Sequence, residues 1–384
     1  MHQRHTWILA AAFSLGVSAC GEPMEQEVVD LEPLPEDDRG FELYELDGCS
    51  ENAPSPRVMG ALYEDTDMSS QSRWVGEFGD EDTALAGARV ELIGANGTWS
   101  APVCDDGTFG IADLPEGDYF VRPVTEGAFP VCTTSTHGRR FAEAMAQGEL
   151  DVVVFGDSLP HYGPQPWWPE RFEARADAIA DVTLHNIAVP GAESPQWLPG
   201  RGFWNSALEP LLDDADVFVF SIGGNDLYAL ADVDLSVVSV GELAMQFEEK
   251  VVEIESNVRE IATALRERNP NADIVYVVYP DYGNTDRWAA LAGDAIPIVR
   301  RTLRSTLNRI RGDNAHHERM TYLDLYGATV QIDLNELLFD ELHFNEAGQA
   351  FVAEELFRSL GGVRVEGDGI DAVEIGLSAD TGGE

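Results

Sequence analysis

The stretch from residue 151 to residue 159, DVVVFGDSL, constrains the fold more than any other part of the chain. Consecutive β-branched and aromatic residues at positions 152–155 predict a buried central strand of a parallel sheet. Gly156 then lets the backbone turn sharply, and Ser158 lies on that turn. Because ligands bind at the carboxyl ends of strands in open α/β sheets, Ser158 lies where a nucleophile would be useful.

Three later blocks place further polar groups after apolar runs. The block NIAVPGAES puts Gly191 behind an apolar run at 182–189, and VFVFSIGGNDL puts Asn225 at the end of a third strand. Far downstream, FDELHFNEAG contains Asp340 and His343, three residues apart. On a helical turn this spacing would bring the carboxylate beside the imidazole.

These four blocks, in this order, resemble the SGNH family of serine hydrolases, also called GDSL hydrolases, over roughly residues 150–360. A lone GDSL tetrapeptide is a weak signal, but GDSL, a glycine block, GGND and DxxH together are specific. The resemblance implies that Ser158 is the nucleophile, His343 the base and Asp340 its orienting partner. It further implies an oxyanion hole formed by the N–H groups of Ser158 and Gly191 and the side-chain amide of Asn225.

The chemistry of acyl transfer asks for the same residue types. A serine hydroxyl is a poor nucleophile at neutral pH, so an imidazole must take its proton while a carboxylate fixes the tautomer. The negative charge of the tetrahedral intermediate needs preorganised donors, each contributing about 3–4 kcal/mol. No cofactor or metal is required for this reaction. Asp157 and Asp226 also lie in the motifs, but capping a helix or binding a turn amide is an equally good interpretation of each.

Alternating strands and helices predict the fold class of this region. Strand candidates are residues 151–155, 182–187, 217–220, 274–278 and 322–325, and the longest helical stretch is 243–268. This alternation predicts an α/β protein with a flavodoxin-like three-layer α/β/α arrangement. Two aromatic-rich insertions follow Ser158 and Gly191. Their tryptophans, Trp167, Trp168, Trp197 and Trp204, are expected either to line the substrate crevice or, more often, to be buried against the sheet.

The N-terminal residues predict export. Residues 1–19 combine Arg4 with a short apolar stretch, which is typical of a signal peptide. The string ending at Cys20 resembles a bacterial lipobox, which implies lipid attachment to the Cys20 thiol and a membrane anchor; the alternative is an ordinary cleaved signal. Residues 20–54 are acidic and predict a tether.

A second domain is expected between the tether and the hydrolase region. Residues 55–135 contain short β-like runs at 58–63, 88–93, 109–111 and 119–124, which predict an antiparallel β-sandwich. The strings ALAGARVELIG and DDGTFGIADLPEGDYFV resemble prealbumin-like surface modules. The remaining divisions are a connector at 136–149, the hydrolase domain at 150–362 and an acidic tail at 363–384. Cys49, Cys104 and Cys132 allow one disulfide, and the sequence does not choose its pairing.

Composition limits the partners. The formal net charge of −45 leaves no basic stripe that could neutralise phosphates, which argues against nucleic acid. The sequence as a whole therefore predicts an exported, lipid-anchored serine esterase acting on an acylated carbohydrate, a lipid ester or a small acyl ester. Two alternatives stay open: an acyltransferase that uses the same site, and a surface binding protein with an idle hydrolase fold.

Overall fold

The computed structural model describes residues 43–45, 57–64, 83–112, 114–124, 131–132, 139–228, 240–282, 285–286, 320–330, 332–366 and 371–379. The chain divides into two units, Met1–Glu32 and Pro33–Glu384, and every described residue belongs to the second. The predicted signal segment, Cys20 and most of the tether therefore lie outside the described residues. No helix within the described ranges is long and apolar enough to cross a membrane.

A five-stranded parallel sheet carries the predicted site region. Its strands are β9 (Glu149–Gly156), β10 (Asp181–Asn186), β11 (Val217–Ser221), β12 (Asp273–Val278) and β13 (Met320–Asp324). They lie in the order β10-β9-β11-β12-β13, and every neighbouring pair is parallel. The five predicted strands are the five observed ones, and no strand end differs from its prediction by more than two residues.

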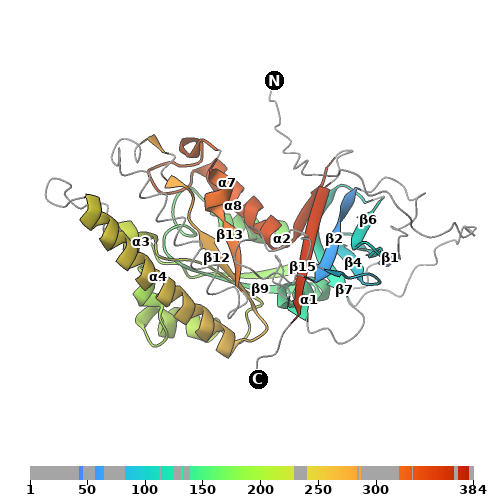
Figure 1. The fold of residues 1–384 in the computed structure, drawn as a ribbon, viewed down its shortest axis with the longest axis horizontal. Helices are drawn as coiled ribbons and strands as arrows, with labels where there is room; N and C mark the ends of the chain where they lie inside the picture. The colour runs from blue at the N-terminus through green and yellow to red at the C-terminus, as the bar shows by residue number, and fades with distance from the viewer. Residues whose placement is uncertain are drawn as a thin grey trace, which may run out of the picture. The chain divides into compact units, whose positions relative to one another are not determined.

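Helices cover both faces of this sheet (Figure 1). The longer helices are α1 (Arg139–Gln147), α2 (Trp168–Ala176), α4 (Val240–Arg268) and α8 (Glu346–Ser359). The shorter ones are α3 (Gly224–Tyr228), α7 (Leu325–Thr329), η1 (Ser194–Trp197), η2 (Trp204–Leu208), η3 (Glu209–Leu211) and η6 (Leu334–Glu336). The three-layer α/β/α prediction is thus confirmed.

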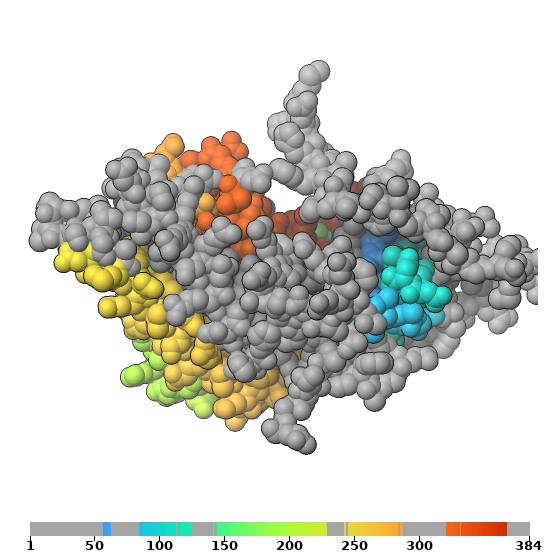
Figure 2. Space-filling view, viewed as in Figure 1, coloured from blue at the N-terminus to red at the C-terminus, as the bar shows by residue number. Residues whose placement is uncertain are grey.

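Alternation along β9 explains why two layers of helices are needed. Val152 and Val154 belong to the core shared with α1, α2 and α8, whereas Val153 and Phe155 belong to the core shared with α4. Successive side chains of a strand point to opposite faces, so an all-apolar strand requires cover on both. The α4 helix shows the matching pattern: it buries apolar residues on the side facing the sheet, and its other side lies at the surface (Figure 2).

The other described strands, which come from before and after the parallel sheet in the sequence, form two sheets around a core of their own. One sheet has the order β1-β5-β4-β7-β14 and the other β3-β2-β15-β8, with β6 beside β2. The strands are β1 (Leu43–Glu45), β2 (Val58–Glu64), β3 (Thr83–Ala84), β4 (Arg89–Gly94), β5 (Gly97–Pro102), β6 (Thr108–Ile111), β7 (Gly117–Val124), β8 (Val131–Cys132), β14 (Gly362–Val365) and β15 (Asp371–Ala379). Apolar residues of both sheets share one core, so this part is a β-sandwich. Most of its pairs are antiparallel, but β1 with β5 and β2 with β15 are parallel.

The C-terminal end of the chain differs from its expected form as an acidic tail. Strand β14 follows α8 directly and pairs antiparallel with β7, and β15 pairs with β2 along seven residues. Figure 1 shows β15 beside β2, although the two are far apart in the sequence. Val363 and Val365 bury themselves in the sandwich core. The sandwich is therefore built from both ends of the chain.

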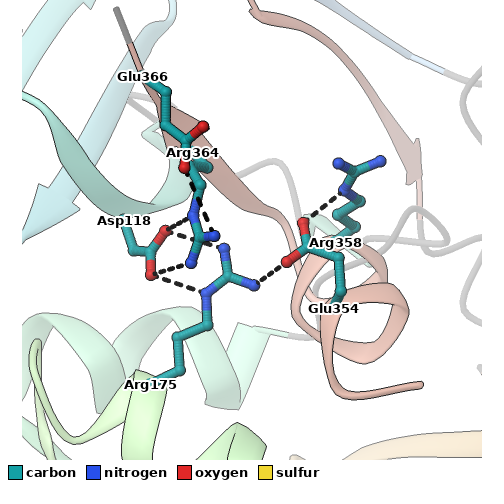
Figure 3. A network of polar contacts seen from close by, with 6 residues as sticks. All are labelled: Asp118, Arg175, Glu354, Arg358, Arg364 and Glu366. Atoms are coloured by element: carbon teal, nitrogen blue, oxygen red, sulfur yellow. Dashed lines mark hydrogen bonds and ion pairs between the residues drawn. The ribbon is translucent and has the colours of Figure 1, made fainter. Parts of the chain in front are cut away.

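A polar network links the sandwich to the helices beside the parallel sheet (Figure 3). Arg175 of α2 donates from Nε and Nη2 to the two carboxylate oxygens of Asp118 on β7, at 2.7 and 2.8 Å. Arg364 of β14 donates to the same carboxylate at 2.8 and 3.1 Å, and Arg175 also contacts Glu354 of α8 at 2.5 Å. The guanidinium of Arg175 lies over the Phe357 ring, 3.4 Å from its centroid. One carboxylate thus joins two arginines from different elements.

Cys104 is disulfide-bonded, so of the three pairings that the sequence left open, the one between Cys49 and Cys132 is excluded. The choice between Cys49 and Cys132 as its partner lies outside the described side chains.

Candidate active site

A glycine turn at the end of β9 presents Ser158. Gly156 has φ +119°, and a Cβ at this position would lie 1.9 Å from the carbonyl oxygen of Ser221 on β11. Only glycine allows β9 and β11 to stay this close where the chain turns. The N–H of Asp157 donates to Ser221 O at 3.0 Å, and the N–H of His161 donates to Ser158 O at 3.0 Å. The serine therefore lies on a tight turn fixed at both ends.

Ser158, His343 and Asp340 form an unbroken hydrogen-bonded chain. The Ser158 Oγ lies 2.9 Å from His343 Nε2, and His343 Nδ1 lies 2.8 Å from Asp340 Oδ2. Because an ionised carboxylate only accepts hydrogen bonds, Nδ1 carries the ring proton and Nε2 is left to accept the serine proton. The arrangement can convert a serine hydroxyl into a nucleophile.

The segment that holds Asp340 and His343 is a loop and not a helical turn, so the predicted reason for their proximity was wrong. A bridge between Leu338 and Phe344 closes the loop before α8 begins at Glu346. The Asp340 Oδ1 atom accepts the N–H groups of Leu342 and His343 at 2.8 and 2.7 Å. Folding the carboxylate back onto its own loop brings it beside the imidazole at the same three-residue spacing.

These contacts keep Asp340 ionised. Partial burial by itself would raise the pKa of this carboxyl, but the hydrogen bonds from the Leu342 N–H and from the His343 ring and N–H outweigh it and lower the pKa below the usual value. Asp340 is therefore ionised at neutral pH, and its negative charge can stabilise a positive charge on the His343 ring.

Gly191 and Asn225 lie at the ends of two neighbouring segments that follow β10 and β11. Gly191 has φ +82°, and a Cβ built there would meet nothing within 4 Å, so the space in front of its Cα is open. Asn225 lies in the first turn of α3 and donates from Nδ2 to Ala192 O at 2.9 Å, which leaves one amide proton. Among the described residues, the N–H groups of Ser158 and Gly191 have no hydrogen-bond partner. Such unoccupied donors can receive an oxyanion.

A buried network holds these two segments together. Asp226 accepts the Ser194 N–H at 2.9 Å and the Ser194 hydroxyl at 2.7 Å, and Asn257 of α4 donates to Ser194 Oγ at 2.8 Å. Asp226 follows Asn225, and Ser194 follows Gly191 by three residues. The network therefore fixes the candidate oxyanion donors from behind. Sequence reasoning identified Asp226 as a candidate turn-amide acceptor but missed Ser194 and Asn257, which carry no local signal.

Asp157 supports the nucleophile turn from the core side. Its side chain is 2% exposed and accepts the Leu159 N–H at 3.1 Å and the Ser221 hydroxyl at 2.9 Å. The Tyr279 hydroxyl donates to its other oxygen. Burial raises the pKa of Asp157 to about 6, although these hydrogen bonds oppose the rise. The turn-amide interpretation of Asp157 fits this geometry, and the roles of Ser221 and Tyr279 were not visible in the sequence.

The tryptophans of the two insertions mainly support the turn rather than facing outward. Trp168, Trp197 and Trp204 are buried. Trp168 Nε1 donates to Leu159 O at 3.0 Å, and Trp197 Nε1 donates to Gly156 O at 3.1 Å. The exposed aromatic side chains beside His343 are instead Tyr162 and Phe339, which the sequence reasoning did not single out.

No group of three or more His, Cys, Asp or Glu side chains in the described part of the chain is arranged to hold a metal ion.

Comparisons with known proteins identify the family of the chain. The model of the GDSL-like Lipase/Acylhydrolase family matches residues 154–351, just over half of the chain. A search of curated protein sequences found no match. Similar solved structures include a lipase from a goat rumen metagenome, which is 17% identical, covers 56% of this chain and 100% of its own, and has a TM-score of 0.46.

Two further solved structures are similar at the same level. A phospholipase A1 from Streptomyces albidoflavus is 16% identical over 54% of this chain and 98% of its own, with a TM-score of 0.39. An acetylxylan esterase from Geobacillus stearothermophilus is 16% identical over 55% of this chain and 94% of its own, with a TM-score of 0.40.

Proposed function

Because the chain belongs to the GDSL-like lipase/acylhydrolase family and is therefore a carboxylic ester hydrolase, we propose that it works through an acyl-enzyme on Ser158. In this proposal His343 is the general base and Asp340 orients it. The observation that carries the assignment is the hydrogen-bonded chain from Ser158 Oγ through His343 to Asp340, with contacts of 2.9 and 2.8 Å.

Acylation begins when Ser158 Oγ attacks the ester carbonyl carbon while its proton passes to His343 Nε2. The carbonyl π electrons move to the oxygen, and the N–H groups of Ser158 and Gly191 with the Asn225 amide would stabilise that negative charge. The intermediate then collapses, the bond to the alcohol oxygen breaks, and the imidazolium returns its proton to that oxygen. The products of this half-reaction are a free alcohol and an acylated serine.

Deacylation repeats the sequence with water as the nucleophile. His343 takes a proton from the water as its oxygen attacks the acyl carbon, and the same donors receive the second oxyanion. Collapse breaks the bond to Ser158 Oγ, which regains a proton from His343. A carboxylic acid leaves and the enzyme is restored.

The first test compares hydrolysis of short-chain and long-chain p-nitrophenyl esters by a soluble form that begins after Cys20. Ser158→Ala should lose at least about 10³-fold in kcat, because the base then has no nucleophile to activate. Ser206→Ala, at an exposed serine bonded only to a backbone carbonyl in the described structure, is the matched control. Parental activity in Ser158→Ala would refute the assignment.

The same assay bears on the substrate class, for which we propose an acylated carbohydrate, a lipid ester or a small acyl ester. A preference for acetyl over long acyl chains would favour the first and the last. A preference for long chains would favour a lipid ester.

We also propose that the protein is exported and anchored through a lipid on Cys20. The short apolar stretch that ends in a lipobox-like string supports export, and so does the disulfide at Cys104, since disulfides persist mainly in oxidising compartments. The acidic residues 20–42, which precede strand β1 of the sandwich, would act as a tether. The sandwich, with its resemblance to prealbumin-like surface modules, would act as a spacer.

The anchoring proposal predicts how the full-length chain fractionates in a bacterial host. The parent should sediment with membranes, dissolve only with detergent and incorporate labelled palmitate, whereas Cys20→Ala should do none of these. Cys49→Ala is the control, because it also removes a cysteine but leaves the lipobox intact. Membrane retention and palmitate incorporation by Cys20→Ala would rule out this anchor.

A further inference from the structure

Two exposed aromatic rings adjoin the catalytic imidazole. Tyr162 is 45% exposed and Phe339 is 49% exposed. The Tyr162 ring centroid lies 4.3 Å from that of His343 and 5.9 Å from that of Phe339, and the Phe339 and His343 centroids are 6.0 Å apart. Large apolar rings left at the surface beside a reacting group cost hydration free energy, which a bound ligand would recover.

The two rings come from different segments whose backbones are fixed. Gln349 of α8 donates from Nε2 to Tyr162 O at 3.0 Å and to Phe344 O at 3.3 Å, and it is fully buried. The Phe339 N–H donates to His343 O at 3.0 Å. Gly163, with φ +104°, lets the first loop approach closely, because a Cβ there would lie 2.7 Å from Phe344 O. The pair is therefore preorganised, which lowers the entropy cost of binding.

The position of the rings indicates whether they would contact the acyl portion or the alcohol portion of an ester substrate. His343 Nε2 must return its proton to the alcohol oxygen when the tetrahedral intermediate collapses, so that oxygen lies within hydrogen-bond distance of the ring. The alcohol portion then extends over the surroundings of His343, where Tyr162 and Phe339 lie. The oxyanion faces Gly191 and Asn225, which belong to other segments.

We propose that Tyr162 and Phe339 form a subsite for the alcohol portion of the substrate, and that this portion is a saturated ring with an apolar face. A sugar ring and a simple cyclic alcohol share that chemistry, since each can stack its C–H groups on an aromatic ring. This inference rests on the proposed hydrolysis at Ser158 and adds the specificity of its leaving group.

The test uses esters that share one acyl group and differ in the alcohol. The substrates are ethyl acetate, cyclohexyl acetate and an acetylated methyl glucoside. Each is incubated with the parent, Tyr162→Ala, Phe339→Ala or Tyr162→Phe, and the release of acetic acid is measured with a pH-stat. The measured quantity is kcat/KM for each ring-alcohol ester divided by kcat/KM for ethyl acetate. We expect this ratio to fall about tenfold in each alanine variant. Tyr162→Phe should keep the parental ratio, because it keeps the ring.

Val330→Ala, at another exposed apolar side chain, is the matched control and should leave all three rates unchanged. A loss for the glucoside and cyclohexyl ester together supports a subsite open to sugars, and a loss for cyclohexyl acetate alone supports one for apolar rings. If ethyl acetate hydrolysis falls in parallel with the others, or if no ratio changes, the subsite is refuted. Failure of the proposed function has a different signature, in which the parent itself and Ser158→Ala hydrolyse the esters equally.

Discussion

At the scale of single residues, the imidazole of His343 is held through both of its ring nitrogens. Asp340 holds Nδ1, and Ser158 lies at Nε2. Asp340 cannot swing away, because two backbone N–H groups hold its second oxygen. In the proposed mechanism, a base held in this way needs little reorganisation when the proton moves, which is the form of catalysis that preorganised polar groups provide.

The buried carboxyl of Asp157 makes a testable contribution to stability. Its pKa in the folded protein is raised by burial from 3.8 to about 6, so the native state binds this proton more tightly than the unfolded state. The contribution is fully present below about pH 4 and is lost as the pH rises through about 6. We expect Asp157→Asn, which keeps one acceptor oxygen and cannot ionise, to remove this loss.

The measurement is urea unfolding at pH 4 and at pH 7.5. Between these values the parent should lose about 2–3 kcal/mol more of unfolding free energy than Asp157→Asn loses. Asp181→Asn, at an exposed carboxyl, controls for the general effect of removing a charge. Parallel pH profiles for the parent and Asp157→Asn would show that Asp157 titrates normally.

At the scale of elements, sequence reasoning succeeded where the signal is local. The strand at β9 and its glycine turn, the length of α4 and the positions of the other parallel strands follow from apolar runs and periodicity. The strand β5, GTWSAP, was missed because it has few β-branched residues and is stabilised by pairing between β1 and β4. Its two-residue connection to β4, Ala95-Asn96, was the available hairpin signal.

The features that could not be predicted from the sequence depend on contacts between segments that are far apart along the chain. The triad residues were recognisable from motifs, but the pairing of Tyr279 with Asp157 joins residues 122 positions apart. Likewise, β14 was taken for part of an acidic tail because its partner, β7, lies some 240 residues earlier in the chain. Composition favours a solvated tail for such a segment, and only the sandwich core gives Val363 and Val365 a place to be buried.

At the scale of the whole described structure, the chain leaves the sandwich through α1, forms the parallel sheet, and returns to the sandwich at β14. Elements before and after the hydrolase region thus share one core, so unfolding of the sandwich would release α8 at its C-terminal end. Asp118 lies at this junction, where Arg175 of α2 and Arg364 of β14 share its carboxylate. The junction should therefore contribute to the stability of both parts.

The last prediction concerns the pH dependence of that junction. Burial alone would raise the pKa of Asp118, but hydrogen bonds from Arg175 and Arg364 outweigh it and lower the pKa from 3.8 to about 2. A lowered pKa stabilises the fold above about pH 4, and this contribution is lost as the pH falls from about 4 towards 2. At pH 7, Asp118→Asn should reduce the unfolding free energy by about 1–2 kcal/mol, allowing for partial solvent screening.

Urea unfolding of the parent and Asp118→Asn at pH 7, 5 and 3 tests this dependence, since the difference between them should be constant from pH 7 to 5 and smaller at pH 3. The matched control is Asp213→Asn, which breaks a bidentate pair with Arg268 whose side chains are 61% and 55% exposed. An exposed pair of this kind contributes little, so this variant should unfold like the parent. An equal loss in both variants would mean that the Asp118 network contributes no more than a surface ion pair.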